Sequence, residues 1–162
     1  MTSKPLNVHG TGLVLGQIGV LLRGPSGSGK SLLALELLDR WTQNGDGAVL
    51  VADDRLDLSL VDGAIVMAAP ANIAGLIELR GRGIVRRPYR QQALVQLVVD
   101  LVDSLERMPE TAAFQIDLMG HKVARAPVPR RGVVDSQHQI MLVREALADY
   151  AHHGLQQCQK TT

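Results

Sequence analysis

One stretch of the sequence reads Gly24-Pro25-Ser26-Gly27-Ser28-Gly29-Lys30-Ser31 and matches the pattern G-x-x-x-x-G-K-[ST] at every fixed position. Its glycines allow successive backbone N–H groups to turn inward around phosphate oxygens. The lysine can reach the terminal phosphates of a nucleotide, and the last serine hydroxyl can bind Mg²⁺. Residues 24–31 therefore predict a phosphate loop whose eight residues contact a bound nucleotide.

The residues on both sides of the phosphate loop fit this prediction. Ahead of it, residues 13–15 and 18–22 read as two short strands separated by a Gly16-Gln17 break. Behind it, residues 31–41 predict a helix with an apolar stripe and an ion pair on the polar side, formed by Leu33, Leu37 and Trp41 and by Glu36 and Arg40. A glycine loop that merely caps a helix is the alternative, and the strand and the amphipathic helix favour nucleotide binding over it.

Two carboxylates follow the next predicted strand, residues 48–52. They belong to Asp53 and Asp54, and the carboxyl end of a buried strand is where α/β sheets bind their ligands. Asp53 can hold Mg²⁺, or it can act as a general base that takes a proton from an attacking hydroxyl. A solvated Asp-Asp-Arg turn is the third interpretation, and the neighbouring phosphate loop argues against it.

The rest of the chain completes the prediction of an α/β fold, with a mixed sheet, a helix after the phosphate loop and a C-terminal helix. Further along, the expected elements are a hairpin at 58–67 around Asp62-Gly63, a strand at 77–79, a glycine- and arginine-rich loop at 80–90, strands around 114–118 and 122–131, and a helix over 136–153 that Gly154 ends. Residues 94–105 fit both a helical stripe and a run of strand-favouring valines.

The composition excludes several classes of protein. The 162 residues are 46% hydrophobic but only 2% aromatic, so a base-stacking binder of single strands is hard to build. The formal net charge of +1 provides no field that attracts nucleic acid or an anionic membrane. No apolar run approaches the roughly 18 residues of a membrane span. We expect a soluble, cytoplasmic protein that binds neither nucleic acid nor membrane.

Three blocks of residues resemble a known family when they are taken together. The blocks are His9-Gly10 with Lys30 following 21 residues after the histidine, Val51-Ala52-Asp53-Asp54, and Glu78-Leu79-Arg80-Gly81-Arg82-Gly83-Ile84. They are similar to the opening, the acid pair and the Glu-Ile-Arg-Gly-x-Gly-Ile signature of the HPr kinase/phosphorylase family of bacterial phosphotransferase systems. The resemblance is good from residue 9 to about residue 84 and weak beyond.

The resemblance implies a kinase domain with a phosphoenolpyruvate-carboxykinase-like fold, which uses ATP and Mg²⁺ to phosphorylate a serine of HPr. Many members also remove that phosphate by phosphorolysis, so pyrophosphate or inorganic phosphate can take part. Position by position, Lys30 and Ser31 would hold phosphate and metal, Asp53 would exchange the serine proton and bind metal, and Glu78 would be a further metal ligand.

Two more residues take catalytic roles only through the resemblance. His9 would lie beside Asp53, and Arg107 would supply a catalytic arginine. The resemblance also favours a strand over residues 94–102, and it implies a hexamer.

The sequence departs from the family in ways that leave alternatives open. We expect a single kinase domain over residues 1–162, without the family's N-terminal domain and with a flexible tail from about residue 155. The family's Pro-Gly-Arg-Asn stretch, tied to dephosphorylation, is replaced by residues 127–132, so phosphoryl transfer to HPr is the main expectation. A small-molecule kinase that reads an acidic substrate with the arginines of the 80–90 loop is one alternative. A nucleotide-binding regulatory module with little turnover is the other.

Overall fold

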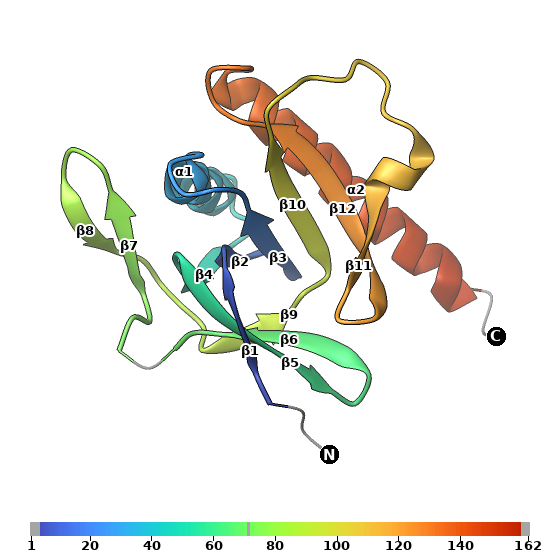
Figure 1. Cartoon of the computed structure of the whole chain (residues 1–162), viewed down its shortest axis with the longest axis horizontal. Coiled ribbons are helices and arrows are strands. Elements are labelled where there is room, and N and C mark those ends of the chain that lie inside the picture. The colour runs from blue at the N-terminus through green and yellow to red at the C-terminus, as the bar shows by residue number, and fades with distance from the viewer. Residues whose placement is uncertain (1–3, 71, 160–162) are drawn as a thin grey trace.

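The structure is a computed structural model that describes residues 4–70 and 72–159. A six-stranded mixed sheet forms its centre, as the sequence predicts (Figure 1). The strands follow the order β11 (Gln115–Leu118), β12 (His121–Pro129), β10 (Leu97–Val102), β3 (Ile18–Arg23), β2 (Thr11–Leu15) and β4 (Ala48–Ala52). β3, β10 and β12 are parallel to one another, and β2 is antiparallel to both β3 and β4. The carboxyl ends of β3, β4, β10 and β12 therefore meet at one edge of the sheet.

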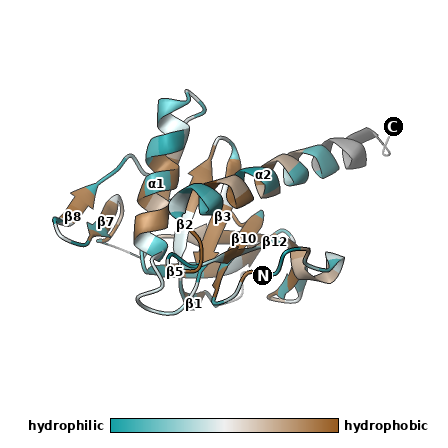
Figure 2. Cartoon of the chain, turned by 90° about the horizontal axis from the view of Figure 1, so that it is seen from above, coloured by the Kyte–Doolittle hydropathy of each residue, from teal (hydrophilic) through white to brown (hydrophobic). Residues whose placement is uncertain are grey.

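Two helices cover one face of this sheet. α1 (Lys30–Gln43) starts at the end of the phosphate loop and buries the predicted stripe of Leu33, Leu37 and Trp41. α2 (Ser136–Gln159) buries Ile140, Val143 and Leu147 against the same core. In Figure 2 the strands beneath the two helices are largely brown, because both faces of the central strands are apolar.

Two details of the helices differ from the predictions. Glu36 of α1 accepts a hydrogen bond from the guanidinium of Arg131, which follows β12, so its ion pair ties the two halves of the sheet together rather than joining Arg40. α2 continues past Gly154 to Gln159, and the predicted end at Gly154 is wrong. A glycine inside a helix costs only about 1 kcal/mol relative to alanine, so it does not by itself end one. The remainder of the predicted tail, residues 160–162, lies outside the described residues.

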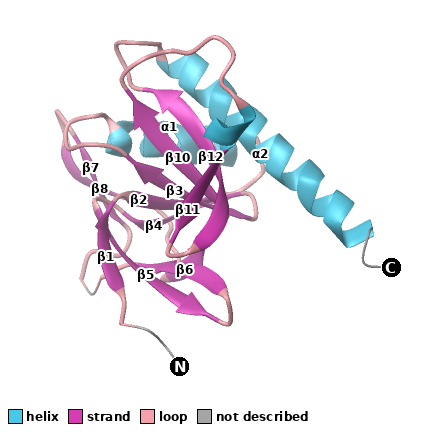
Figure 3. Ribbon diagram, turned by 45° about the vertical axis from the view of Figure 1, so that its right-hand side comes forward, coloured by secondary structure: helices cyan, strands magenta, loops and turns pink. Residues whose placement is uncertain are grey.

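A smaller sheet packs on the other face of the central sheet (Figure 3). Its order is β1 (Leu6–His9), β5 (Arg55–Val61), β6 (Ala64–Ala68) and β9 (Gln92–Leu94). β5 and β6 form the predicted hairpin, with φ of 50° at Asp62 and 79° at Gly63. The two layers meet so closely that a Cβ on Gly19 would lie 1.7 Å from the carbonyl oxygen of Leu94.

The remaining elements correct one prediction and confirm another. Residues 80–90 are not simply a loop, because β7 (Leu76–Leu79) and β8 (Gly83–Arg86) form an antiparallel hairpin. A 3₁₀ turn, η1 (Thr111–Phe114), precedes β11, so Phe114 lies in this turn and the strand begins at Gln115. Residues 94–105 hold β10, so the strand that the resemblance favours is confirmed against the helical stripe. None of the helices in residues 4–70 and 72–159 is long and apolar enough to cross a membrane.

Candidate active site

The phosphate loop joins the carboxyl end of β3 to the start of α1. Gly27 and Gly29 have φ of 80° and 92°, the left-handed region that glycine enters without strain. Gly24 is required for a different reason, since a Cβ there would lie 2.8 Å from Ser28 Oγ and 3.0 Å from Leu101 Cβ. The N-terminal end of α1 thus points its unpaired backbone N–H groups and its positive dipole end into the loop, which is the arrangement that binds phosphate.

Lys30 lies folded into the phosphate loop. Its side chain is buried, and its Nζ donates to the carbonyl oxygens of Gly24 and Pro25 at 2.7 and 3.2 Å. An ammonium has three donor hydrogens, so one remains for a ligand. Ser28 Oγ is also buried and has no hydrogen-bond partner among the described residues. A buried hydroxyl without a partner is costly, and an incoming phosphate oxygen is the kind of acceptor that would relieve the cost.

The carboxylate of Asp53 is held by donors from three elements. Ser31 Oγ at the start of α1 donates to Asp53 Oδ1 at 2.8 Å, and Thr11 Oγ1 of β2 donates to the same oxygen at 2.9 Å. The backbone N–H of Glu78 in β7 donates to Oδ2 at 3.3 Å. Ser31 and Asp53 meet because β3 and β4 end at the same edge of the sheet, so the loop after one strand faces the carboxylate after the other.

His9 lies beside the second aspartate, Asp54. Its Nδ1 is 3.5 Å from Asp54 Oδ1, and both side chains are about two-thirds exposed (67% and 65%). Asp54 has a φ of 70°, and its carbonyl oxygen accepts the N–H of Gly10 at 3.0 Å. This left-handed turn sends consecutive carboxylates in different directions, Asp53 toward the phosphate loop and Asp54 toward His9. The ion pair of His9 is thus with Asp54, the residue next to the Asp53 that the resemblance implies.

A pocket of about 370 Å³ opens between these groups. Its lining residues are Ser26, Gly27, Gly29, Lys30, Ser31, Leu32, Asp53, Asp54, Glu78, Leu79 and Arg80. The β7–β8 hairpin brings Glu78 and Arg80 here because the segment after it runs along β4, where Leu50 donates to Pro88 O and accepts from Arg90 N, both at 2.9 Å. Arg87, one of the arginines of residues 80–90, instead pairs with Asp39 on α1, with 3.2 Å between Nε and Oδ1.

Two of the proposed catalytic residues, Arg107 and His9, do not line this pocket. Arg107 is exposed, in the segment between β10 and η1. The segment leaves β10 at the same sheet edge as the phosphate loop leaves β3, because the two strands are parallel. His9 is also absent from the lining and reaches the pocket only through Asp54.

An ionic cluster fixes the sheet where the phosphate loop begins. Arg23, the last residue of β3, makes two hydrogen bonds to the carboxylate of Asp100 at 2.8 and 2.9 Å, and Arg125 Nε makes a third at 2.6 Å. Burial by itself would raise the pKa of Asp100, but the hydrogen bonds and charges of the two arginines hold that pKa below its usual range. The bond to Asp100 also raises the pKa of Arg23.

The donor set fits the metal ion and the nucleotide that the resemblance implies. No group of three or more His, Cys, Asp and Glu side chains gathers as a metal cage in the described part of the chain. Mg²⁺ in nucleotide sites needs no such cage, since it takes one or two protein oxygens together with waters and phosphate oxygens. The Ser31 hydroxyl and the Asp53 carboxylate are such oxygens, and they already lie in contact. The carboxylate of Glu78 is exposed and lines the same pocket.

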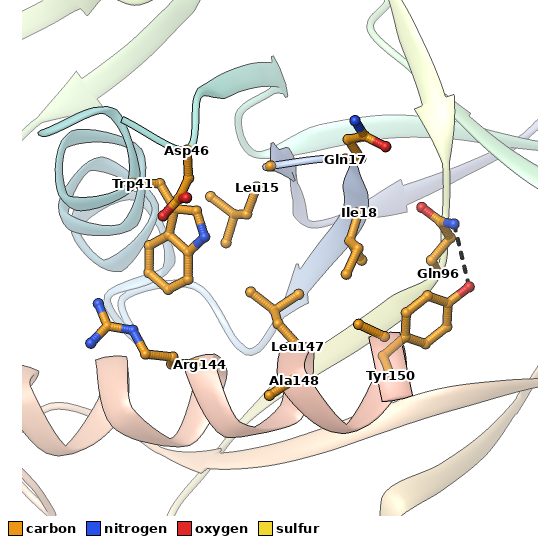
Figure 4. A pocket seen from close by; sticks show the side chains of 12 residues that line it. Leu15, Gln17, Ile18, Trp41, Asp46, Gln96, Arg144, Leu147, Ala148 and Tyr150 are labelled. Atoms are coloured by element: carbon orange, nitrogen blue, oxygen red, sulfur yellow. Dashed lines mark hydrogen bonds between the residues drawn. The ribbon is translucent and has the colours of Figure 1, made fainter. Parts of the chain in front are cut away.

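A second and larger pocket, of about 680 Å³, lies between the end of α1 and α2 (Figure 4). The guanidinium carbon of Arg144 lies 5.2 Å from the centre of the Trp41 ring there, and Gln96 Nε2 donates to the Tyr150 hydroxyl at 3.3 Å. No residue of the phosphate loop and neither aspartate of the acid pair lines it.

A phosphate loop that caps α1, with a strand-end aspartate bonded to its last serine, defines a nucleotide-binding α/β domain of the phosphate-loop kinase type. The family model described as HPr Serine kinase C-terminal domain matches residues 2–156, and the chain belongs to that family. The resemblance inferred from the three sequence blocks is thereby confirmed, and it extends well beyond residue 84.

Named relatives agree with this membership. An HPr kinase/phosphorylase of Clostridium beijerinckii is 30% identical over 156 residues, covering 90% of this chain and 49% of that protein. One of Bordetella pertussis is 40% identical over 115 residues, covering 63% and 35%. The structure of the Hpr(Ser) kinase/phosphatase from Coxiella burnetii has a TM-score of 0.74 at 24% identity, over 96% of this chain and 98% of that one, and supports the fold. The chain spans about half or less of the length of these curated relatives.

Proposed function

We propose that this domain transfers the γ-phosphoryl group of ATP to a serine of HPr or an HPr-like phosphocarrier protein. The observation that carries the proposal is the hydrogen bond of 2.8 Å between Ser31 of the phosphate loop and Asp53. It places a carboxylate that can accept a proton next to the residue that would hold the metal ion and the terminal phosphates. The names of the relatives supply the class of acceptor.

The nucleotide phosphates would lie in the phosphate loop, against the N-terminal end of α1 and within reach of Lys30. Ser31, with Asp53 and Glu78 beside it, would hold Mg²⁺. When bound, the metal ion neutralises charge on the phosphate oxygens as the bond to the leaving group weakens. Lys30 adds a fixed positive charge that needs no rearrangement, since it is already buried at the loop.

The carboxylate of Asp53 would act as the general base. The acceptor serine gives its proton to Asp53 while its oxygen bonds to the γ-phosphorus, and the bond from that phosphorus to the β–γ bridging oxygen breaks, so that ADP leaves. The proton then passes from Asp53 to water. His9 would support the reaction through Asp54, and Arg107 would stabilise the transferring group only if the segment of residues 103–110 folds over the pocket.

The test is to mix the purified protein with HPr and Mg·ATP and to weigh HPr by mass spectrometry. We expect one added phosphate, located on one serine by fragmentation, and none with Asp53→Asn. Serine-phosphorylated HPr with inorganic phosphate tests the reverse reaction in the same assay, and pyrophosphate can replace ATP as donor. An HPr that stays unmodified under all donors would contradict the proposal. The hexamer implied by the resemblance remains a prediction, for which light scattering is the measurement.

A small-molecule kinase is the second candidate, and Arg80 is the observation that favours it. Arg80 lines the pocket, so a small acidic substrate would meet a guanidinium close to the phosphate loop. Release of ADP that depends on a metabolite and not on HPr would support this alternative.

A further inference from the structure

Thr11 is the most deeply buried polar residue near the site, and nothing in the sequence motifs marks it. Its side chain is completely buried (0% exposed), at the first position of β2. The hydroxyl donates to Asp53 Oδ1 at 2.9 Å, and Asp54 N approaches the same hydroxyl at 3.5 Å. A buried threonine hydroxyl is normally hydrogen-bonded to a nearby acceptor. Here the partner is the carboxylate that the proposed reaction depends on.

We propose that Thr11 is a positioning residue, which orients the carboxylate of Asp53 and determines which of its oxygens is free to accept the substrate proton. The role in proton transfer rests on the proposed function, whereas the orienting contact does not. Thr11 touches neither nucleotide nor acceptor in this proposal and acts through Asp53 alone.

The count of acceptor positions on the carboxylate supports this role. Each carboxylate oxygen offers about two hydrogen-bond acceptor positions. Oδ1 receives both Thr11 Oγ1 and Ser31 Oγ, so its positions are filled. Oδ2 receives the N–H of Glu78 at 3.3 Å and keeps one position open. Without Thr11 the carboxylate would keep one donor on each oxygen, from Ser31 and from Glu78, and would lose one of the three hydrogen bonds that hold its orientation.

The strand pairing next to this contact is irregular. β2 and β4 shift register between Gly12 and Leu13, which face Ala52 and Leu50, so Val51 is an extra residue on β4 two positions before Asp53. A bulge re-aims the side chains near it and is frequent beside active sites. Gly12 allows the close packing, since a Cβ there would lie 2.9 Å from Met67 Sδ. Threonine is also stiff at χ1 because it is β-branched, so the hydroxyl is fixed with little loss of entropy.

Two substitutions separate the hydroxyl from the shape of the side chain. Thr11→Val replaces the hydroxyl with a methyl group of similar size, and Thr11→Ser keeps the hydroxyl and loses the methyl group. We expect Thr11→Val to lower kcat for phosphorylation of HPr by about 10- to 100-fold, with the KM for HPr changed by less than about threefold. We expect Thr11→Ser to restore most of kcat, although it packs less well. Thr42→Val, at an exposed position near the end of α1, is the matched control.

A second readout tests the orienting contact without any catalysis. The amide N–H of Glu78 reports on Asp53 because it donates to Oδ2, and it lies on a different element from Thr11. In ¹⁵N-correlated NMR spectra, Thr11→Val should move the Glu78 amide resonance in the same direction as Asp53→Asn does, while Thr11→Ser and Thr42→Val leave it in place. The thermal midpoint of each variant is measured alongside, so that general loss of structure is recognised.

The two readouts keep this inference distinct from the proposed function. If the wild-type protein fails to phosphorylate HPr but the Glu78 resonance moves as described, the proposed function is wrong and the orienting role of Thr11 stands. If Thr11→Val leaves the Glu78 resonance where the wild type has it, Thr11 does not position Asp53, whatever the activity. A folded Thr11→Val with wild-type kcat would overturn its part in the reaction.

Discussion

Of the two pockets of this molecule, the larger one is mostly apolar, and the smaller one holds the charged and hydroxyl groups. The pocket between α1 and α2 has about 680 Å³ and is formed largely by apolar side chains such as Leu15, Ile18 and Leu147. The pocket at the phosphate loop has about 370 Å³ and, apart from Leu32 and Leu79, is formed by glycines, serines and charged side chains. Three of the four buried polar side chains in the described residues, Thr11, Ser28 and Lys30, are in or next to the smaller pocket.

The difference shows where the fold tolerates unfavourable arrangements. Around the phosphate loop, a buried ammonium rests on two carbonyls, Ser28 Oγ has no partner, and Asp54 has a positive φ. Each of these costs free energy in the absence of ligand, and such features gather at functional sites. Around the α1–α2 pocket no buried side-chain polar atom of the described residues lacks a hydrogen-bond partner, and Gln96 donates to Tyr150 there. Chemistry is therefore expected at the smaller pocket, and substitutions at the two pockets should have very different effects.

The largest expected effect is on Asp53. Asp53→Asn keeps the size of the side chain and removes the base, so the rate of phosphate transfer to HPr should fall by about 1,000-fold. Radiolabelled ATP and HPr give that rate over the required range. An activity within about tenfold of wild type would show that Asp53 is not the general base of the reaction. Binding of the metal ion would then be its remaining role.

The next effect is on nucleotide affinity and concerns Lys30. Lys30→Met keeps the aliphatic stem but removes the buried charge, so the dissociation constant for Mg·ATP should rise by about 100-fold. Isothermal titration calorimetry measures that constant without any acceptor protein. Arg40→Met, on the same helix and outside the pocket lining, serves as the control and should bind Mg·ATP like the wild type. Equal affinities for the wild type and Lys30→Met would contradict binding at the phosphate loop.

A smaller effect, on stability, is expected at the ionic cluster of Arg23, Asp100 and Arg125. Asp100 is only 14% exposed, and Asp100→Asn leaves two arginines without a counter-charge, so the free energy of unfolding at pH 7 should fall by about 2 kcal/mol. The pKa of Asp100 is lower in the folded protein than its ordinary value, so this stabilisation is full above the unfolded pKa of about 3.9 and is lost as pH falls through the folded pKa.

Urea denaturation of the wild type and Asp100→Asn from pH 7 to pH 3 measures this difference. The gap between the two proteins should stay constant down to about pH 4 and narrow below it. Other carboxylates titrate in the same range but are common to both proteins, so they cancel in the difference. A gap that widens in acid would show that the folded pKa of Asp100 lies above its unfolded value.

Local patterns in the sequence predicted the parts of the site that are short and self-contained. The phosphate loop, α1 and the strand before Asp53 each occupy fewer than about 15 consecutive residues. The glycines predict the phosphate loop, and the spacing of the apolar residues predicts the helix and the strand. The sequence does not predict strand β8, because its residues are mostly exposed and show no alternation of apolar and polar residues. β10 was ambiguous because it is buried between both layers, and a strand buried on both faces has no period of two.

The sequence did not predict the contacts between residues that lie far apart along the chain. Thr11 and Asp53 are 42 positions apart, and their bond depends on β2 pairing with β4 and on the register shift beside Gly12. The placement of His9 on Asp54 depends on the positive φ of Asp54, which a non-glycine residue seldom adopts. The extension of α2 past Gly154 shows the limit of a single-residue stop signal.

The smallest expected effect tests the larger pocket. Arg144 is exposed and stacks over Trp41, a contact worth about 0.5 kcal/mol at such a position. Arg144→Ala should therefore lower the free energy of unfolding by about that amount and leave Mg·ATP affinity and transfer to HPr unchanged, with Glu145→Ala on the same helix as the control. If Arg144→Ala instead changed the transfer rate by tenfold or more, the pocket between α1 and α2 would be coupled to the reaction. The contrast between the two pockets would then be wrong, because the larger pocket, which shares no residue with the phosphate loop, would still affect the reaction at the smaller one.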